Sequence, residues 1–164
     1  DAVMDESSMA LQLVQAGNLK SSIRILQRAM DKGQFHRIVI GSDTPTGTGV
    51  MPLAVIKTVA ELSSLAGIDP ALMWAAATGN SARVWNLDEG LLAVGRPMNV
   101  VVMDAPWGST KSDALGALSV GDIPGISAVV SRGAVQTLLS RNTPRAARLA
   151  TTSPEIPHLA GGGH

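Results

Sequence analysis

Hydrophobic residues recur every three or four positions through the first half of the chain, and this spacing predicts helices. The predicted helices cover residues 7–14, 19–32, 53–66 and 70–77, with one or two further helical turns after residue 77. Gly17, Gly33 and Gly67 follow the first three, which is a common way for a helix to end. Asp69 and Pro70 form a typical start for the fourth.

Apolar runs without helical spacing predict the strands. The run "RIVIG" at 37–41 is continuously apolar, which is typical of a strand buried on both faces. After residue 90, short runs separated by Gly or Pro predict a β-rich unit. These runs are "LLAVG" at 91–95, "MNVVVMDAP" at 98–106, "GISAVVSRG" at 125–133 and "AVQTLL" at 134–139. A small helix is expected within 111–121, and 141–164 is expected to be extended or disordered.

The composition argues against several classes of function. Of the 164 residues, 45% are hydrophobic and 16% are charged, which supplies enough apolar surface for a core. Thirteen basic and thirteen acidic residues cancel, so neither nucleic acid nor a membrane is expected as a partner. The lack of cysteine removes disulfides, thiolate nucleophiles and cysteine-ligated zinc. No apolar run approaches the roughly 20 residues that span a bilayer, and a cytoplasmic location is expected.

Asp43 follows the run at 37–41 in a loop rich in Gly, Thr and Pro, and it is the main candidate for a functional residue. A phosphate-binding loop is disfavoured, because no Lys follows Gly47 or Gly49 and Pro52 stands where a third Gly would be needed. Asp43 is alternatively a turn or cap residue that satisfies backbone amides. The remaining alternative is a metal ligand, since catalytic residues of (β/α)₈ barrels lie where the strands end.

Motifs on both sides of Asp43 resemble the C-terminal part of the amidohydrolase superfamily. The matching positions are 41–43, Ala77, Thr78, Asn80, Ala82, Gly90, Leu92, Gly95 and 100–104. Within the superfamily, "GSDTPTGTG", "ATGNSARVWNL", "GDIPGIS" and "SRNTP" are most similar to the enamidase group of bacterial nicotinate fermentation. The resemblance covers residues 5–148. It departs from the family's A-D-L pattern at Met98, Asn99 and Val100, where a structural effect is expected.

The resemblance implies an α/β fold: the C-terminal part of a (β/α)₈ TIM-like barrel, followed by part of a small composite β-sandwich domain. The implied segments are 1–89 for the barrel, 90–148 for the composite domain and 149–164 for a flexible tail. Only one barrel strand is expected, at 37–41, whereas a full barrel takes about 250 residues. The chain, which starts at Asp1 rather than Met, is therefore expected to be a portion of a longer enzyme and inactive alone.

The resemblance further implies a metal-dependent hydrolase that acts on C–N bonds other than peptide bonds. The implied substrate is a cyclic amide or enamide, a reduced hydroxynicotinate-type ring that is opened to an aldehyde with loss of ammonia. Asp43 is the implied catalytic base and ligand, in a centre of two divalent ions, zinc or iron. Thr46 and Thr48 are expected to donate hydrogen bonds to a substrate carboxylate. A homo-oligomer, by resemblance a tetramer, is also implied.

The family's other metal ligands are missing from the sequence: an H-x-H pair, a bridging Lys or Glu, and two single histidines. His36, His158 and His164 are expected to be solvated surface residues. Two alternatives therefore stay open. One is a non-catalytic module, either degenerate or used for assembly, and the other is a different amidohydrolase such as an imidazolonepropionase-like enzyme. Trp74, Trp85 and Trp107 are expected in the core or at an interface rather than as a stacking platform. Arg141 is expected at the surface or in a subunit contact rather than as a substrate clamp.

Overall fold

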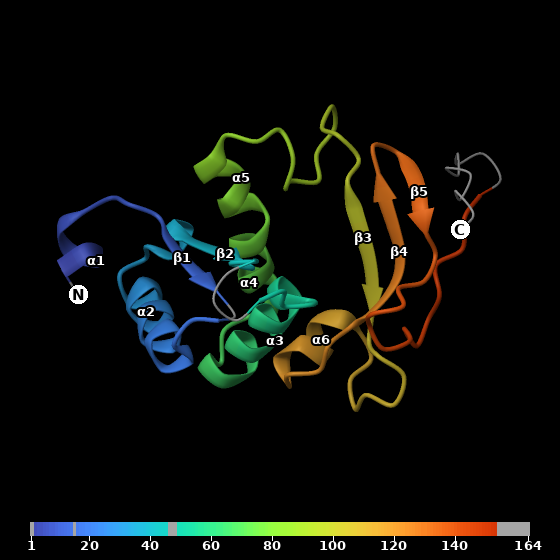
Figure 1. The fold of residues 1–164 in the computed structure, drawn as a ribbon, viewed down its shortest axis with the longest axis horizontal. Helices are drawn as coiled ribbons and strands as arrows, with labels where there is room; N and C mark the ends of the chain where they lie inside the picture. The colour runs from blue at the N-terminus through green and yellow to red at the C-terminus, as the bar shows by residue number, and fades with distance from the viewer. Residues whose placement is uncertain (1, 15, 46–48, 154–164) are drawn as a thin grey trace.

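A computed structural model describes residues 2–14, 16–45 and 49–153 of the chain. Helices pack against one face of a two-stranded parallel sheet in one part, and a three-stranded antiparallel sheet forms the other (Figure 1). The first part contains α1 (Ala2–Glu6), β1 (Leu11–Val14), α2 (Leu19–Asp31), η1 (Phe35–Arg37), β2 (Ile38–Gly41), α3 (Ala54–Ala66), α4 (Pro70–Ala77) and α5 (Gly79–Trp85). The second contains β3 (Val100–Asp104), α6 (Ala114–Ser119), β4 (Gly125–Ser131) and β5 (Ala134–Thr137).

Side-chain caps and a glycine set several helix ends. The side chains of Asn18, Asp69 and Asp113 each accept a hydrogen bond of 2.8 to 3.0 Å from a backbone N–H in the first turn of α2, α4 and α6. Gly67 ends α3 with a left-handed backbone, at a φ of 65°. The helices predicted at 19–32, 53–66 and 70–77 are thus confirmed, and α5 supplies the further turns after residue 77.

The helix predicted over 7–14 is wrong, because residues 11–14 form β1. This strand pairs in parallel with β2, in a register that places Leu11 opposite Ile38 and Val14 opposite Gly41. Leu11 and Leu13 alternate with the exposed Gln12, a period of two that suits a strand with one face buried. The described residues therefore include two parallel strands joined by α2, whereas the sequence predicts a single barrel strand.

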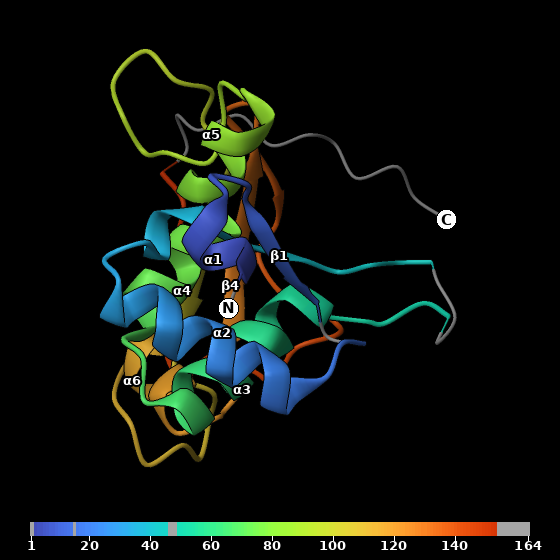
Figure 2. The same ribbon diagram turned by 90° about the vertical axis from the view of Figure 1, so that its left-hand side faces the viewer.

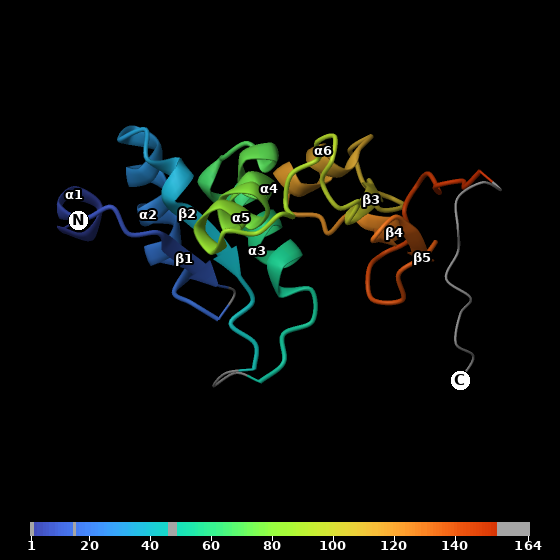
Figure 3. The same ribbon diagram turned by 90° about the horizontal axis from the view of Figure 1, so that it is seen from above.

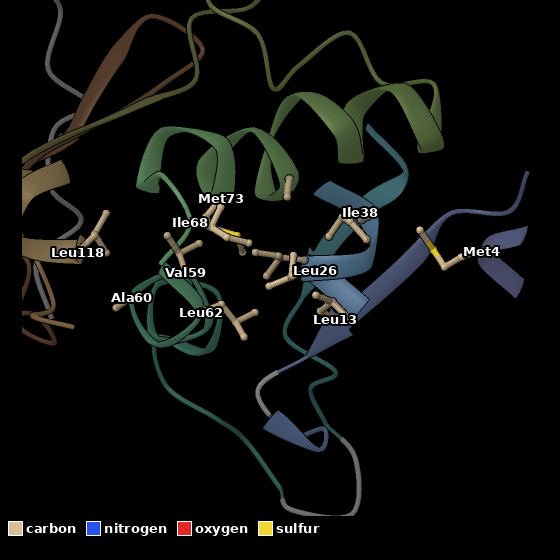
Figure 4. Packing of buried hydrophobic residues seen from close by; sticks show 13 residues of the cluster. Met4, Leu13, Leu26, Ile38, Val59, Ala60, Leu62, Ile68, Met73 and Leu118 are labelled. Carbon is tan, nitrogen blue, oxygen red and sulfur yellow. The ribbon is translucent and has the colours of Figure 1, made fainter. Parts of the chain in front are cut away.

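One face of the parallel sheet packs against the helices and forms the core (Figure 4). Leu13 of β1 and Ile38 of β2 contribute to the same buried cluster as Leu26 of α2 and Leu62 of α3. Further members of the cluster are Met4, Ile40, Val59, Ala60, Ile68, Met73 and Leu118. Since burial of one large aliphatic side chain stabilises a fold by about 1.5–3 kcal/mol, this cluster holds β1 and β2 firmly against α2, α3 and α4.

The antiparallel sheet has the strand order β3-β4-β5, with α6 in the connection between β3 and β4. Its strands confirm the centres of the runs predicted at 98–106, 125–133 and 134–139, and α6 confirms the small helix. The run at 91–95 is not a strand. Leu92 is 87% exposed, and the N–H of Arg96 closes a turn on the carbonyl of Ala93 at 3.1 Å. No strand among the described residues pairs with this run, so its apolar residues do not form β structure.

Residues 143–148 have irregular structure with one bridge residue and pack on the second sheet, so the disorder considered for this stretch is not found. Ala146 is buried and forms a β-bridge with Pro106. The hydroxyl of Thr143 accepts a hydrogen bond from the N–H of Ile126 at 3.2 Å. Of the tail predicted at 149–164, the part up to residue 153 has no regular structure, and the remainder lies outside the described residues.

Asp104, at the end of β3, forms a bidentate ion pair with Arg148. The Nε and Nη2 groups of Arg148 donate to the two carboxylate oxygens at 2.7 Å each, and its backbone N–H donates at 2.9 Å. These hydrogen bonds lower the pKa of the buried Asp104 to about 2. The pair fastens the C-terminal segment to the end of β3.

We expect this ion pair to make the stability of the fold depend on pH. The folded pKa of about 2 lies below the unfolded value of about 3.9. The contribution is therefore fully present above about pH 4 and is lost as the pH falls toward about 2. Asp104→Asn should lower the free energy of unfolding by about 1 kcal/mol at pH 7, since the exposure of Arg148 limits the effect. Denaturant titrations should show this difference shrinking below pH 4, and a difference that persists unchanged at pH 2 would contradict the assignment. Asp88→Asn, at an exposed carboxylate, is the control.

Candidate metal-binding site

Asp43 lies two residues beyond the carboxyl end of β2, where the sequence predicts it. The strand beneath it is rigidly held, since its first three residues are buried. The carboxyl ends of β1 and β2, at Val14 and Gly41, meet at one edge of the sheet because the strands are parallel. Asp43 is exposed just beyond this edge. This is the position in which (β/α)₈ barrels carry catalytic side chains.

The loop after Asp43 leads to α3 through two residues with left-handed backbone. Asp43 has a φ of 53°, which Asp and Asn adopt more readily than other non-glycine residues, and Leu53 has a φ of 59°. The N–H of Met51 donates to the hydroxyl of Thr44 at 3.5 Å and so links the two arms of the loop. Both arms extend away from α2 and α4 (Figures 2 and 3). The predicted substrate-binding residues Thr46 and Thr48 lie outside the described residues.

Side chains of α5 fix the opposite, amino end of β2. The Nδ2 group of Asn80 donates to the carbonyls of Phe35, at 3.2 Å, and Ile38, at 2.9 Å. Arg83 donates to the carbonyl of His36. Asn80 is part of the A-T-x-N-x-A motif of the sequence analysis, but the motif alone does not indicate that Asn80 binds the start of β2. By holding the start of β2, α5 positions the strand that ends below Asp43.

Arg37 holds the first residues of the chain against the same end of β2. Its buried guanidinium donates to the carbonyls of Val3, Met4 and Met9, to Ser7 Oγ and to Gln34 Oε1, over 2.8 to 3.4 Å. All five acceptors are neutral, so the charge is balanced by oriented dipoles rather than by a carboxylate. The sequence gives little indication of this role, since it shows only a single Arg directly before a buried strand.

The face of the parallel sheet that turns away from the core carries Gln12, Val39 and Gly41. Residues paired across the strands share a face, and successive residues alternate between faces. Since Leu13 and Ile38 point into the core, Gln12 and Val39, which are paired, point the other way. A β-carbon at Gly41 would overlap the carboxamide of Gln12, at 2.8 Å from its Cδ. Gly41 therefore leaves room for the Gln12 side chain beside the strand that leads to Asp43.

Across residues 2–14, 16–45 and 49–153, no group of three or more His, Cys, Asp or Glu side chains is placed to hold a metal ion. A catalytic zinc ion typically takes three protein ligands. The carboxylate of Asp43 suits one coordination position, so the described residues fit one position of a metal centre and not the whole. His36 lies at the amino end of β2, far from Asp43, and His158 and His164 lie outside the described residues.

The tryptophans do not form a common site. Trp74 packs against the core cluster, as predicted. Trp85 and Trp107 are 63% and 76% exposed, so a core position is wrong for both, and an interface position remains a prediction. The guanidinium of Arg145 lies 5.7 Å from the ring centroid of Trp107. Arg141 is exposed, as predicted.

None of the described helices is both long enough and apolar enough to cross a membrane.

Comparison with known proteins decides what this arrangement resembles. Over 150 residues, 92% of its length, the chain is 43% identical to enamidase from Eubacterium barkeri, of which it covers 39%. The crystal structure of enamidase, described as a new member of the amidohydrolase superfamily, matches 91% of the chain with a TM-score of 0.89 at 42% identity. The chain is a homologue of part of enamidase, an amidohydrolase. It spans about two fifths of the length of enamidase. No protein-family profile matches the chain.

More distant structures share only the fold with this enamidase homologue. A β-aspartyl dipeptidase from Fervidobacterium islandicum matches 90% of the chain and 34% of its own, with a TM-score of 0.58 at 20% identity. The same dipeptidase in complex with β-Asp-Leu gives a TM-score of 0.54 at 17% identity. The predicted resemblance to enamidase is thus confirmed, together with a mixed α/β fold and a hydrolase relationship.

Proposed function

We propose that the complete protein is a metal-dependent amidohydrolase that opens a cyclic amide or enamide at its ring C–N bond. The observation that carries the proposal is Asp43, directly beyond a buried parallel strand, in a chain 43% identical to enamidase. The proposed substrate is a reduced hydroxynicotinate-type ring, which places the reaction in nicotinate catabolism. A six-membered ring of this kind holds its amide in the cis form.

The proposed architecture is the C-terminal part of a (β/α)₈ barrel at 1–89, part of a composite β-sandwich at 90–148 and a tail at 149–164. The order β1-α2-β2-α3 is that of consecutive barrel units, and it supports this division. Among the described residues, the outer edges of β1 and β2 pair with no other strand. Val101 and Val102 on the edge strand β3 are exposed. Strands from elsewhere in a longer polypeptide would cover these edges, as is general for exposed edge strands.

Asp43 would serve as ligand and as acid and base. A bound divalent metal, zinc or iron in a two-ion centre, supplies Lewis-acid polarisation and lowers the pKa of water. The carboxylate of Asp43 accepts the proton of the attacking water and delivers it to the ring nitrogen as the C–N bond breaks. Hydrolysis of the ring C–N bond by this first water molecule gives a carboxylate and an enamine. The enamine tautomerises to an imine, and a second water releases the aldehyde and ammonia.

The described residues supply one ligand, so we expect the 164-residue chain alone to lack turnover. The complete protein would act as a homo-oligomer, by resemblance a tetramer. Two other outcomes are distinguishable. A non-catalytic module would hydrolyse no amide, and an imidazolonepropionase-like enzyme would prefer a five-membered ring.

The test is hydrolysis of cyclic amides by the complete protein, with ring opening followed by mass spectrometry and ammonia release measured separately. We expect turnover of a six-membered unsaturated lactam that carries a ring carboxylate. Dialysis against a chelator should abolish this turnover, and Zn²⁺ or Fe²⁺ should restore it. Metal-replete protein that opens none of the lactams would refute the proposed function, and preference for an imidazolone would reassign the substrate.

A further inference from the structure

Gln12 reaches from β1 toward the edge of the sheet beyond which Asp43 lies. In the strand register, Gln12 stands opposite Val39. Its carboxamide nevertheless lies against Gly41, two residues nearer the carboxyl end of β2. Two residues of a strand correspond to about 6.6 Å. The polar end of Gln12 therefore lies close to the start of the loop that carries Asp43, on the face of the sheet opposite the core cluster.

The carboxamide of Gln12 has a defined position but no polar partner among the described residues. The side chain is exposed, and its amide forms no hydrogen bond with any other described residue. The neighbouring Gly41 has no positive φ that would require a glycine. The room that Gly41 provides for the Gln12 side chain is the steric reason for a glycine at this position. Within the part of the chain that the structure describes, both the donor and the acceptor of the carboxamide are thus available to a ligand on this face.

We propose that the Gln12 carboxamide recognises the amide group of the cyclic substrate, an inference that rests on the proposed function. A lactam holds its C=O and N–H on the same side of the C–N bond, because the ring forces the cis form. A primary carboxamide presents one N–H donor beside one C=O acceptor, in the complementary arrangement. Gln12 Nε2 donates to the lactam oxygen, and Oε1 accepts from the lactam N–H. Gln12 is a specificity residue here, and Asp43 performs the proton transfers.

A purely structural role for Gln12 makes a different prediction. If its side chain only fills the space beside Gly41, replacing it lowers the turnover of every substrate to a similar degree. If its carboxamide recognises the substrate amide, replacing Gln12 lowers the turnover of a lactam far more than that of a lactone with the same ring. A lactone keeps the shape and the carbonyl but lacks the N–H, and its different intrinsic reactivity cancels when variant and wild type are compared as ratios.

The experiment measures kcat/KM of the complete, metal-replete protein with a six-membered lactam and with the matching lactone. Gln12→Met keeps the length of the side chain and removes both hydrogen-bonding groups. We expect the lactam-to-lactone ratio of kcat/KM to fall by about 10- to 100-fold in Gln12→Met. Gln27→Met, at an exposed position on α2, is the matched control and should leave the ratio unchanged. A ratio that Gln12→Met does not change would overturn the inference.

Gly41→Ala supplies an independent second variant. Its β-carbon would displace the Gln12 carboxamide, which is the flexible end of a side chain, so the fold should persist. We expect Gly41→Ala to lower the lactam-to-lactone ratio as Gln12→Met does, and to lower it no further when combined with Gln12→Met. Equal additional losses in the two backgrounds would contradict the coupling. If the ratio is insensitive to Gln12 while lactam hydrolysis proceeds, only this inference fails. If neither compound is hydrolysed, the proposed function fails with it.

Discussion

Asp43→Asn should lower kcat for lactam hydrolysis by on the order of 10³-fold or more in the complete protein. The substitution removes the charge that binds a cation and the base that accepts the proton of the attacking water. Asn adopts the left-handed backbone of position 43, at a φ of 53°, as readily as Asp does. The loop should therefore keep its conformation, which Asp43→Ala would not guarantee. Steady-state kinetics with the six-membered lactam measures the effect.

Asp69→Asn is the control for the change in charge. Asp69 caps α4 by accepting a hydrogen bond from the N–H of Ala71 at 2.8 Å, and Asn is an equally good cap. We expect kcat within a factor of about two of the wild type, because a surface substitution of this kind changes little. Near-normal turnover in Asp43→Asn would show that Asp43 is a turn residue rather than part of the chemistry.

Arg37→Met should lower the free energy of unfolding by about 3 kcal/mol, the largest stability effect that we expect. Arg37 is buried, and its guanidinium satisfies five neutral acceptors that would otherwise lack these donors. Hydrogen bonds to charged groups contribute about 1.5–3 kcal/mol, and unsatisfied buried acceptors add a cost. Because those acceptors lie mainly in residues 3–9, the loss should first release this segment from the end of β2.

Chemical denaturation of the complete protein measures the Arg37 effect, with hydrogen exchange in residues 3–9 as the local readout. Arg24→Met, at an exposed position on α2, is the matched control and should change the stability by less than about 0.5 kcal/mol. Arg37→Lys should fall between the two, since an ammonium has three donors and lacks the planar fork. Equal stability of Arg37→Met and Arg24→Met would show that the five hydrogen bonds add little.

Local signals in the sequence predicted most helices and the position of Asp43. Asp69 and Pro70 mark a helix start through their own chemistry, and Gly67 marks an end, so both could be read without knowledge of the fold. The continuous apolar run at 38–40 is also a local signal, and it predicts the buried strand β2 correctly. The position of Asp43 beyond the end of this strand could therefore be predicted from the sequence as well.

Predictions from the sequence were wrong or missing where contacts between distant parts of the chain decide the structure. Residues 11–14 alternate over only four positions, too short a stretch to outweigh the helical spacing read over 7–14, and they form a strand because β2 lies beside them. The similar run at 91–95 lacks a partner strand among the described residues and forms a turn. The approach of Gln12 to Gly41 depends on the parallel register, which no local pattern reveals. Arg37 likewise acts through residues about 30 positions earlier in the chain.

The metal affinity of the complete protein tests the role of Asp43 most directly. Wild type, Asp43→Asn and Asp69→Asn would be equilibrated at the same series of free Zn²⁺ concentrations, and bound metal would be counted by mass spectrometry. If Asp43 ligates the metal, the affinity of Asp43→Asn should fall by at least the 10- to 100-fold that loss of an outer-shell partner typically causes, while Asp69→Asn matches the wild type. Identical binding curves for all three proteins would contradict the role of Asp43 as a metal ligand.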